Sequence, residues 1–264
     1  MLARGVKPRE TFMAKTALVT GAGNRIGRAI ASALGAAGWN VAVHYHKSRK
    51  SAEGLVAEIK RCGAGAVAIQ ADLSNPYQLQ AILPKISGTL GLVDCLINNA
   101  AVFERDELDT LDHISWESHL AVNLTAPLLL TQAMARGLSN KEKGNVINIV
   151  DQRVWNLTPH FVSYTLSKSG LWTMTQTLAL ALAPRIRVNA IGPGPTLPSK
   201  RQTTAKFKSQ WQAVPLQRPT AVEEIGEAAL YILGAQAMTG QMVALDGGQH
   251  LGWSQAGALS GDDE

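Results

Sequence analysis

Three residues near the middle of the chain have the types and spacing needed to move a proton. Tyr164 and Lys168 stand four residues apart in a long segment of helical pattern, and Asp151 ends a strand-like run thirteen residues before the tyrosine. Four residues make about one helical turn, so the phenol and the ammonium project from the same face. A nearby cation stabilises phenolate and lowers a pKa that is ordinarily about 10. The pattern predicts a tyrosine that transfers a proton at neutral pH.

A glycine-rich turn near the N-terminus supplies a second chemical signal. Residues 15–19 read as a short buried strand, residues 20–27 as a turn, and the following segment as a helix that ends near Gly38. Glycines allow the backbone to approach a pyrophosphate, which then rests on the amide groups at the N-terminus of the helix. The third glycine, Gly27, comes one residue later than in the usual G-x-G-x-x-G motif, and Ile26 takes its expected place. The segment predicts a dinucleotide site with lengthened spacing.

The charges around and after this turn predict which dinucleotide binds. An NAD enzyme of this architecture carries Asp or Glu near the end of its second strand, where the acid binds the ribose 2′-hydroxyl. Residues 11–52 contain no Asp or Glu, but they contain the basic residues Lys15, Arg25, Arg28, Lys47, Arg49 and Lys50. The donors expected around a 2′-phosphate are Arg25, His46, Lys47 and Ser48. We therefore expect NADPH as the cofactor.

The elements that must position these residues alternate along the chain. Strand-like runs separated by helical patterns predict an α/β protein: a single-domain Rossmann fold whose doubly wound parallel sheet of about seven strands has helices on both faces. At 264 residues, 46% of them hydrophobic, the chain suits one such core. We expect a domain over residues 13–253, an extension over 1–12 and a polar tail over 254–264. The strand-like runs are residues 15–19, 41–43, 66–69, 95–97, 146–150, 187–191 and 242–245.

Further motifs follow the glycine turn in a fixed order. They are Ala71-Asp72-Leu73, Asn98-Asn99-Ala100-Ala101, Asn123, Tyr164 with Lys168, Asn189 with Gly192-Pro193-Gly194, and Thr239-Gly240-Gln241 through Asp246-Gly247-Gly248. Together they make the chain similar to the short-chain dehydrogenase/reductases over about 240 residues, from Lys15 to Trp253. No single motif is specific, but this order makes coincidence improbable.

The resemblance implies a role for each matched residue. The catalytic set would be Asn123, Asp151, Tyr164 and Lys168, in which Lys168 also orients the nicotinamide ribose and Asn123 holds a water that links Lys168 to solvent. It also implies a homotetramer with residues 120–135 and 164–182 at the interface. The cofactor would contact Gly21, Gly23, Asn24, Arg25, Ile26, Gly27, His46, Lys47, Ser48, Asp72, Leu73, Asn99, Ala100, Tyr164, Lys168, Pro193 and Gly194.

Two departures from the family pattern narrow the resemblance. Arg25 stands where most members have a glycine, and Asp151 stands where they have the catalytic serine. Both occur in the pteridine reductases, which also share the run His44-Tyr45-His46-Lys47-Ser48 and place a residue like Phe103 to stack the pterin ring on the nicotinamide. The chain therefore resembles that branch, including its bacterial dihydromonapterin and dihydrofolate reductase relatives. Ala101 differs, because some pteridine reductases have a serine there.

The chemistry of Asp151 agrees with this branch. A carbonyl substrate offers only an acceptor oxygen, which an ionised aspartate repels, whereas pterins and folates carry amino and ring N–H groups that donate to a carboxylate. We expect Tyr164 and Asp151 to pass a proton to the ring nitrogen beside the carbon that receives the hydride. The alternative for Asp151 is a cap at the end of a strand. The substrate residues expected are Arg25, Phe103, Asp151 and Tyr164.

Other functions stay open at this point. A carbonyl reductase acting on a ketone, a ketoacyl thioester or a sugar would share every motif except Arg25, Phe103 and Asp151, and a non-catalytic cofactor sensor would keep only the turn. The basic residues of segment 200–208 fall where the family has its substrate-covering loop; they are Lys200, Arg201, Lys206 and Lys208. They either meet the glutamate tail of a folate or belong to a solvated helix face.

Composition excludes several classes of partner. The net charge of +5 is not accompanied by a nucleic-acid motif, so we expect small anionic ligands and no nucleic acid. The histidines lack metal-ligand spacing, and Cys62 and Cys95 form no disulfide or metal pattern. No signal-peptide core and no run of about 18 unbroken apolar residues occurs. We therefore expect a cytoplasmic enzyme without a metal or a membrane contact.

Overall fold

The computed structural model describes residues 15–199 and 201–252. Within these residues the chain forms one seven-stranded sheet in the order β3-β2-β1-β4-β5-β6-β7, and every neighbouring pair is parallel. The seven predicted strands and the α/β class are confirmed. The expected extension over residues 1–12 and the tail over 254–264 lie outside the described residues. The strands are β1 (Thr16–Val19), β2 (Asn40–Tyr45), β3 (Ala66–Gln70), β4 (Val93–Asn98), β5 (Gly144–Ile149), β6 (Ile186–Pro193) and β7 (Met242–Leu245).

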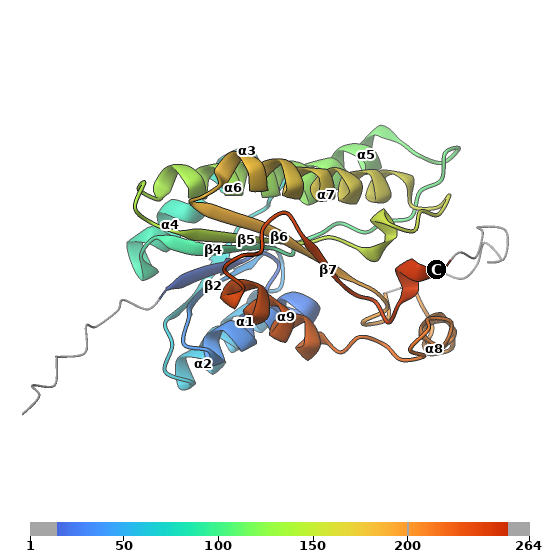
Figure 1. The fold of residues 1–264 in the computed structure, drawn as a ribbon, viewed down its shortest axis with the longest axis horizontal. Helices are drawn as coiled ribbons and strands as arrows, with labels where there is room; N and C mark the ends of the chain where they lie inside the picture. Colours follow the sequence, from blue (N-terminus) through green and yellow to red (C-terminus); the bar gives the residue numbers. More distant parts are fainter. Residues whose placement is uncertain (1–14, 200, 253–264) are drawn as a thin grey trace, which may run out of the picture.

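Helices cover both faces of the sheet (Figure 1). Helices α1, α2 and α9 pack on one face, and α3, α4, α6 and α7 pack on the other. The helices are α1 (Arg25–Ala36), α2 (Arg49–Arg61), α3 (Pro76–Gln80), α4 (Ile82–Leu90), α5 (His113–Leu120), α6 (Ala126–Gly137), α7 (Val162–Leu182), α8 (Thr204–Gln212) and α9 (Val222–Gly234). Shorter turns are the π-helix η1 (Ala121–Thr125) and the 3₁₀ helices η2 (Gln152–Val154) and η3 (Gln249–Leu251).

The apolar sequence pattern explains this layering. The central strands are buried on both faces, as their continuous runs of Val, Ile, Leu and Ala require. On α1, Ile30 and Leu34 lie one turn apart and are fully buried, and each contributes roughly 1.5–3 kcal/mol through burial of its side chain. The same spacing recurs on α9, where Ile225 and Ala229 face the sheet.

The strand order creates a crevice at one edge of the sheet. From β1 the chain first moves outward to β2 and β3, and then returns to β4 on the other side of β1. The connections after β1 and β4 therefore leave the sheet in opposite directions, and ligands of open α/β sheets bind at such a switch point. The glycine turn follows β1 and residues 99–102 follow β4, so the predicted dinucleotide motif lies at this crevice.

Candidate functional site

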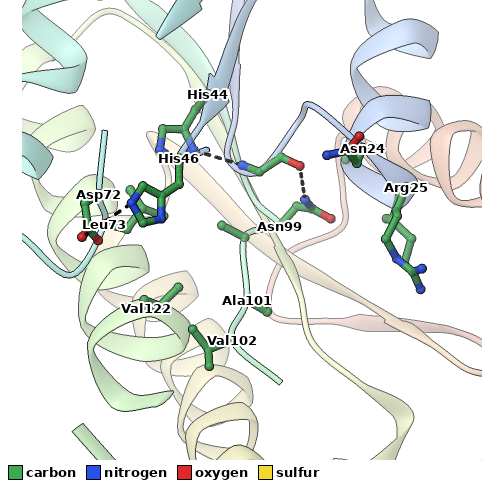
Figure 2. A pocket seen from close by; sticks show the side chains of 14 residues that line it. Asn24, Arg25, His44, His46, Asp72, Leu73, Asn99, Ala101, Val102 and Val122 are labelled. Atoms are coloured by element: carbon green, nitrogen blue, oxygen red, sulfur yellow. Dashed lines mark hydrogen bonds and ion pairs between the residues drawn. The ribbon is translucent and has the colours of Figure 1, made fainter. Parts of the chain in front are cut away.

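One cavity lies at the crevice between β1 and β4 (Figure 2). We call it the turn cavity; its volume is about 410 Å³. It brings together ten of the residues predicted to bind the cofactor, drawn from four separate segments of the chain. The lining residues are Gly21, Asn24, Arg25, Ile26, Gly27, His44, His46, Asp72, Leu73, Asn99, Ala100, Ala101, Val102 and Val122.

A buried histidine holds the glycine turn in place. The backbone N–H of Gly21 donates to Nδ1 of His44 at 3.0 Å, and Nε2 of the same ring lies 3.1 Å from the carbonyl oxygen of Ala71. Because Nδ1 accepts a hydrogen bond, the proton of the neutral ring is on Nε2 and donates to Ala71. Burial lowers the pKa of His44 to about 4, which keeps this ring neutral. The sequence pattern gives no sign of this contact, because the alternation along β2 shows only that His44 and His46 share a face.

Two glycines of the turn are required by close approach of other segments. A Cβ atom on Gly27 would lie 2.4 Å from Nδ2 of Asn99 and 2.5 Å from the carbonyl oxygen of Gly21. The same Asn99 amide donates to the carbonyl oxygens of Thr20 and Gly21, so it joins the turn to the segment after β4. A Cβ on Gly23 would lie 2.5 Å from Oγ of Ser48. The turn thus has no room for side chains on its inner surface.

The start of α1 has amide groups to offer a ligand. Asn24, the N-cap residue, makes no side-chain capping bond, and the first turn of α1 contains no acidic residue. The first N–H groups of a helix lack intrahelical partners and attract anions. Arg25 has a φ of +53°, in the left-handed region that favours glycine, which accounts for the glycine common at this position in the resembled family.

The basic residues divide between two ends of the turn cavity. His46 and Lys47 lie beside Asp72; Nε2 of His46 is 3.8 Å from its Oδ2, and both residues help lower the pKa of Asp72, after the larger effect of hydrogen bonds from Ser74. Arg25 lies at the other end (Figure 2). Its guanidinium donates to the carbonyl oxygens of Leu197 and Pro198 at 3.1 and 2.9 Å. The expectation that Arg25 joins His46, Lys47 and Ser48 around one phosphate therefore needs correction.

Ion pairs reduce the number of available cations near His46. Arg28 pairs with Glu58 at 2.6 Å, and Arg49 pairs with Glu53 at 2.7 Å. Lys47 does not line the turn cavity, but it is exposed in the connection between β2 and α2, next to His46. Ser48 follows it and rests against Gly23. His46, Lys47 and Ser48 are therefore the donors that this side of the turn presents.

A second cavity, of about 500 Å³, adjoins the first. We call it the tyrosine cavity. It contains every substrate residue that the sequence predicted, namely Arg25, Phe103, Asp151 and Tyr164, and it also contains Lys168, Pro193 and Gly194. The walls of both cavities include Arg25, Ile26, Asn99 and Ala101. The two cavities thus form one trough along the carboxyl ends of the strands, with the glycine turn at one end and the tyrosine at the other.

Tyr164 and Asp151 are in direct contact. The phenol of Tyr164 donates to Oδ2 of Asp151 at 2.9 Å, and Oδ1 of Asp151 accepts the backbone N–H of Arg153 at 2.9 Å. Asp151 is therefore both a cap of η2 and a hydrogen-bond partner of the tyrosine, so its role as a cap does not exclude the role predicted for it in proton transfer. Each carboxylate oxygen has a further lone pair, and the carboxylate can accept a hydrogen bond from a ligand as well.

Lys168 lies behind the tyrosine on the same face of α7. Its Nζ is 5.8 Å from the centre of the Tyr164 ring and donates to the carbonyl oxygen of Ile149 at 2.7 Å. Burial lowers the pKa of Lys168 to about 8, and the charge of Asp151 opposes this shift. The predicted pairing of phenol and ammonium on one helical face is present.

Asn123 lies behind the trough and lines neither cavity. It sits in the π-helix η1, a local widening that often marks functional sites. Its Oδ1 accepts the N–H of Val102 at 2.8 Å, and its Nδ2 donates to the carbonyl oxygen of Val102 and to Oγ of Ser167, each at 3.0 Å. The side-chain amide thus joins η1 to the segment after β4 and to α7.

An aromatic pair forms one wall of the tyrosine cavity. The rings of Phe103 and Phe161 stack at 4.7 Å with an angle of 7°, and Phe103 meets Tyr164 edge to face at 4.7 Å. Arg201 donates to the carbonyl oxygen of Phe103 at 2.8 Å and pairs with Glu104. Its guanidinium carbon is 5.4 and 5.8 Å from the centres of the two phenyl rings, so it lies beside the stack and not beyond either ring.

In the segment after β6, Lys206 and Lys208 fit the second of their two alternatives, a solvated helix face. Lys206 and Lys208 are exposed on α8, a helix without buried residues, and neither is among the residues that line the tyrosine cavity in the described ranges. Among the described residues, Arg201 is a basic residue of this segment that does line the cavity. Phe161 also lines the cavity and was not predicted from the sequence, because no local spacing distinguishes it from other loop residues.

The described part of the chain offers no sign of two other kinds of site. Among residues 15–199 and 201–252, no group of three or more His, Cys, Asp and Glu side chains is arranged to hold a metal ion. In the same ranges, no helix is long and apolar enough to cross a membrane.

The chain matches one protein-family model and is similar to solved structures. The family model for short chain dehydrogenase matches residues 15–209. A crystal structure of FolM alternative dihydrofolate reductase 1 from Brucella suis in complex with NADP superimposes with a TM-score of 0.89 and 45% sequence identity, and the match covers 91% of this chain and 97% of that one.

Relatives with other substrates are also similar. Glucose 1-dehydrogenase 2 of Bacillus subtilis is 34% identical over 252 residues, which cover 91% of this chain and 96% of the relative. A 3-oxoacyl-[acyl-carrier-protein] reductase of a Synechocystis species is 31% identical over 239 residues, with 89% and 96% covered.

Proposed function

Because the chain belongs to the short-chain dehydrogenase family, we propose that it is an oxidoreductase that uses NADPH to reduce a pteridine, either a dihydropterin or dihydrofolate. The observation that carries this proposal is the hydrogen bond from Tyr164 to Asp151 in a cavity with Phe103 on its wall. A carboxylate at this position accepts hydrogen bonds from amino and ring N–H groups, and it repels a carbonyl oxygen. The similarity to the NADP-bound FolM protein of Brucella suis supports the same substrate class and the same cofactor.

The residues of the turn cavity fit NADPH. The absence of side chains at Gly23 and Gly27 lets a pyrophosphate approach the uncapped start of α1. His46, Lys47 and Ser48 offer donors to a 2′-phosphate, and the end of β2 carries no acid that would select the 2′-hydroxyl of NADH. Leu73 and Val122 add apolar walls to the cavity beyond Asp72.

The residues of the tyrosine cavity supply binding and proton transfer. When bound, NADPH supplies a hydride to a ring carbon of the pteridine. Phe103 offers a flat aromatic surface to the pteridine ring, and Asp151 accepts its N–H groups. Tyr164, whose hydroxyl donates a hydrogen bond to Asp151 without a ligand, turns this hydrogen to the adjacent ring nitrogen and gives up its proton there, which leaves a phenolate.

Lys168 and Asn123 support the proton donor. The ammonium of Lys168 lies 5.8 Å from the phenol ring and stabilises the phenolate that forms when the proton leaves. Lys168 also orients the nicotinamide ribose. We propose that Asn123, in the π-helix η1, holds a water that links Lys168 to solvent.

The test is an initial-rate comparison. Purified protein is given NADPH or NADH with a 7,8-dihydropteridine, with dihydrofolate and with a panel of ketones and sugars, and oxidation of the cofactor is followed by absorbance. We expect turnover with the pteridines and a preference for NADPH. Turnover of a ketone without any turnover of pteridines would contradict the substrate class and leave the carbonyl-reductase alternative.

A variant sharpens this comparison. Asp151→Ser restores the hydroxyl that donates to a carbonyl and removes the charged acceptor. Loss of a charge-assisted hydrogen bond of roughly 1.5–3 kcal/mol lowers kcat/KM for the pteridine by about 10- to 100-fold. Ketone reduction is expected to hold or rise in the same variant. Equal losses on both substrates would remove Asp151 from substrate selection.

We further propose a homotetramer in the cytoplasm. Exposed leucines on two neighbouring helices, Leu128 and Leu129 on α6 and Leu166 and Leu180 on α7, support an interface there. The free thiols of Cys62 and Cys95 suit a reducing compartment. Light scattering after size-exclusion chromatography is expected to give about four times the mass of the chain, and a monomeric mass would contradict the assembly.

A further inference from the structure

A buried polar cluster lies behind the tyrosine cavity and has no part in the chemistry above. It consists of Asp106, His119 and Ser163, whose exposed fractions are 3%, 0% and 0%. Ser163 donates to Asp106 twice, from its backbone N–H to Oδ1 at 3.2 Å and from its hydroxyl to Oδ2. The Ser163 hydroxyl oxygen also lies 2.7 Å from Nδ1 of His119. We call these three residues the buried cluster.

The hydrogen bonds of His119 fix which nitrogen carries its proton. Nε2 lies 3.1 Å from the backbone N–H of Glu104, which can only donate, so Nε2 accepts. The proton is therefore on Nδ1, where it faces the Ser163 hydroxyl oxygen and the carbonyl oxygen of Ser115 at 2.9 Å. Burial lowers the pKa of His119 and favours this neutral form.

The same geometry excludes a nucleophilic role for Ser163. In a Ser-His-Asp triad the histidine lies between the other two residues and takes the proton of the serine as a base. Here the serine lies between the histidine and the aspartate, and the only lone pair on the histidine ring is occupied by Glu104. Ser163 is also fully buried, so a substrate cannot reach it.

The buried cluster joins the two functional parts of the tyrosine cavity. Phe103 stands three residues before Asp106, and Glu104 stands two residues before it. Tyr164 directly follows Ser163. The carbonyl oxygen of Asp106 also accepts the N–H of Phe161 at 2.8 Å.

Phe161 is itself an unusual residue. It has a φ of +58°, in the left-handed region that large side chains rarely adopt. Its ring stacks against the ring of Phe103. The segment with Phe103 and the helix with the proton donor thus meet at Asp106, which belongs to the segment and accepts from Phe161 and Ser163 at the start of the helix.

We infer that the buried cluster is a set of positioning residues for the reaction. It fixes the ring of Phe103 relative to the phenol of Tyr164, so that a substrate stacked on the phenyl ring meets the proton donor at a set distance. The inference rests on the proposed function, because it assigns Phe103 and Tyr164 the roles given there. Small displacements of reacting groups lower rates strongly, by about 100-fold for roughly 1 Å.

The test uses Ser163→Ala, with Thr175→Val as the matched control. Both variants remove a buried hydroxyl from α7, and Thr175 bonds only to Asn148 and to the carbonyl of Leu171, away from the trough. Each protein is assayed with whichever substrate the wild type reduces, in H₂O and in D₂O, and NADPH affinity is measured by fluorescence titration. Asp106→Asn and the double variant complete a mutant cycle.

We expect Ser163→Ala to lower kcat by about 10- to 100-fold and to raise the solvent isotope effect on kcat, because proton delivery from Tyr164 becomes slower. NADPH affinity should change less than about twofold, and the double variant should be no slower than the worse single variant. A wild-type kcat in Ser163→Ala, or the same isotope effect in Thr175→Val, would overturn the inference.

A second variant and a second substrate separate failure of this inference from failure to fold and from failure of the proposed function. If Ser163→Ala does not fold, the same kinetic signature is required of His119→Gln, which keeps an acceptor for Glu104. If the wild type reduces a ketone and no pteridine, the proposed substrate class fails, while the isotope effect on the ketone still tests the buried cluster.

Discussion

The residue that most distinguishes this site is Asp151. In most of the resembled family a serine donates to a carbonyl at this position, whereas here a carboxylate accepts from Tyr164 and from the backbone of Arg153. The carboxylate is oriented by both contacts and retains lone pairs for a ligand. Under the proposed function, selection for N–H donors over carbonyl oxygens therefore depends on this one side chain.

Removal of the Tyr164 hydroxyl tests the proton donor. Tyr164→Phe keeps the ring against Phe103 but removes the transferable proton, so we expect kcat to fall by about 10²- to 10⁴-fold. NADPH affinity should stay nearly unchanged, because the turn cavity is unaltered. Steady-state rates and fluorescence titration measure the two effects. Tyr231→Phe, on the exposed surface of α9, is the control, and a fully active Tyr164→Phe would remove the tyrosine from this role.

The charge of Lys168 predicts the alkaline limit of activity. Burial lowers the pKa of this lysine to about 8, so its cation is present below that pH and is lost as the pH rises through it. We therefore expect kcat/KM to decline above about pH 8. Lys168→Arg stays protonated and should be slower but without this decline. An unchanged alkaline limb in Lys168→Arg would assign the titration to another group.

Among the elements, the junction of β1 and α1 is held by contacts from two other segments. His44 accepts from Gly21, and Asn99 donates to the carbonyl oxygens of Thr20 and Gly21. The turn is thereby connected to β2 and to the segment after β4, the two elements on either side of the crevice. A change inside the turn must move at least one of these neighbours.

Gly27→Ala is the variant that makes this constraint measurable. Its Cβ would lie 2.4 Å from Asn99 and 2.5 Å from the Gly21 carbonyl oxygen, so the turn must shift. We expect NADPH affinity to fall at least about tenfold, since the amide groups no longer converge on the pyrophosphate. Gly54→Ala in α2 meets no atom within 4 Å and should stabilise the protein by roughly 0.5–1 kcal/mol. Wild-type NADPH affinity in Gly27→Ala would contradict the close-approach argument.

The fold was predictable from the sequence because its signals are local. Each strand is a short apolar run between turn residues, and Tyr164 and Lys168 share a face through helical spacing alone. The buried cluster was not predictable in this way. Ser163 is 44 residues from His119 and 57 from Asp106, and only the packing of α5 against α7 brings them together.

Arg25 and the segment after β6 are two further parts of the chain whose positions could not be predicted from the sequence alone. The sequence places Arg25 in the turn, but its long side chain can reach either end of the trough, and a hydrogen bond to Pro198, 173 residues away, decides which. Likewise, the run of basic residues near residue 205 could form a loop or a helix. The hydroxyl of Thr203 accepts a hydrogen bond from the backbone N–H of Lys206 and so caps the start of α8. On this helix Lys206 and Lys208 lie on an exposed face.

For the molecule as a whole, buried histidines predict how stability depends on pH. The pKa of His44 is about 4 in the folded protein, whereas a histidine in the unfolded chain has its ordinary pKa of 6.5, so the unfolded chain binds more protons between these values. Stability should therefore fall as the pH drops from about 6.5 to about 4, by roughly 3 kcal/mol from this residue. The lowered pKa of His119 acts in the same direction.

Chemical denaturation at several pH values measures this dependence. His44→Asn keeps an acceptor near Gly21 but does not titrate, so it should be less stable at pH 7 and show a smaller slope below pH 6.5. His113→Gln, at an exposed position, is the control and should keep the wild-type slope. A wild-type slope in His44→Asn would show that other groups dominate acid unfolding.

The shared wall between the turn cavity and the tyrosine cavity has a thermodynamic consequence. Arg25, Ile26, Asn99 and Ala101 border both cavities, so a ligand in either one settles the positions of side chains that the other ligand must meet. Affinities linked in this way are reciprocal: whatever factor a bound dinucleotide adds to the affinity for the second ligand, that ligand adds to the affinity for the dinucleotide. Binding in the two cavities is therefore coupled, and the coupling free energy is the same whichever ligand binds first.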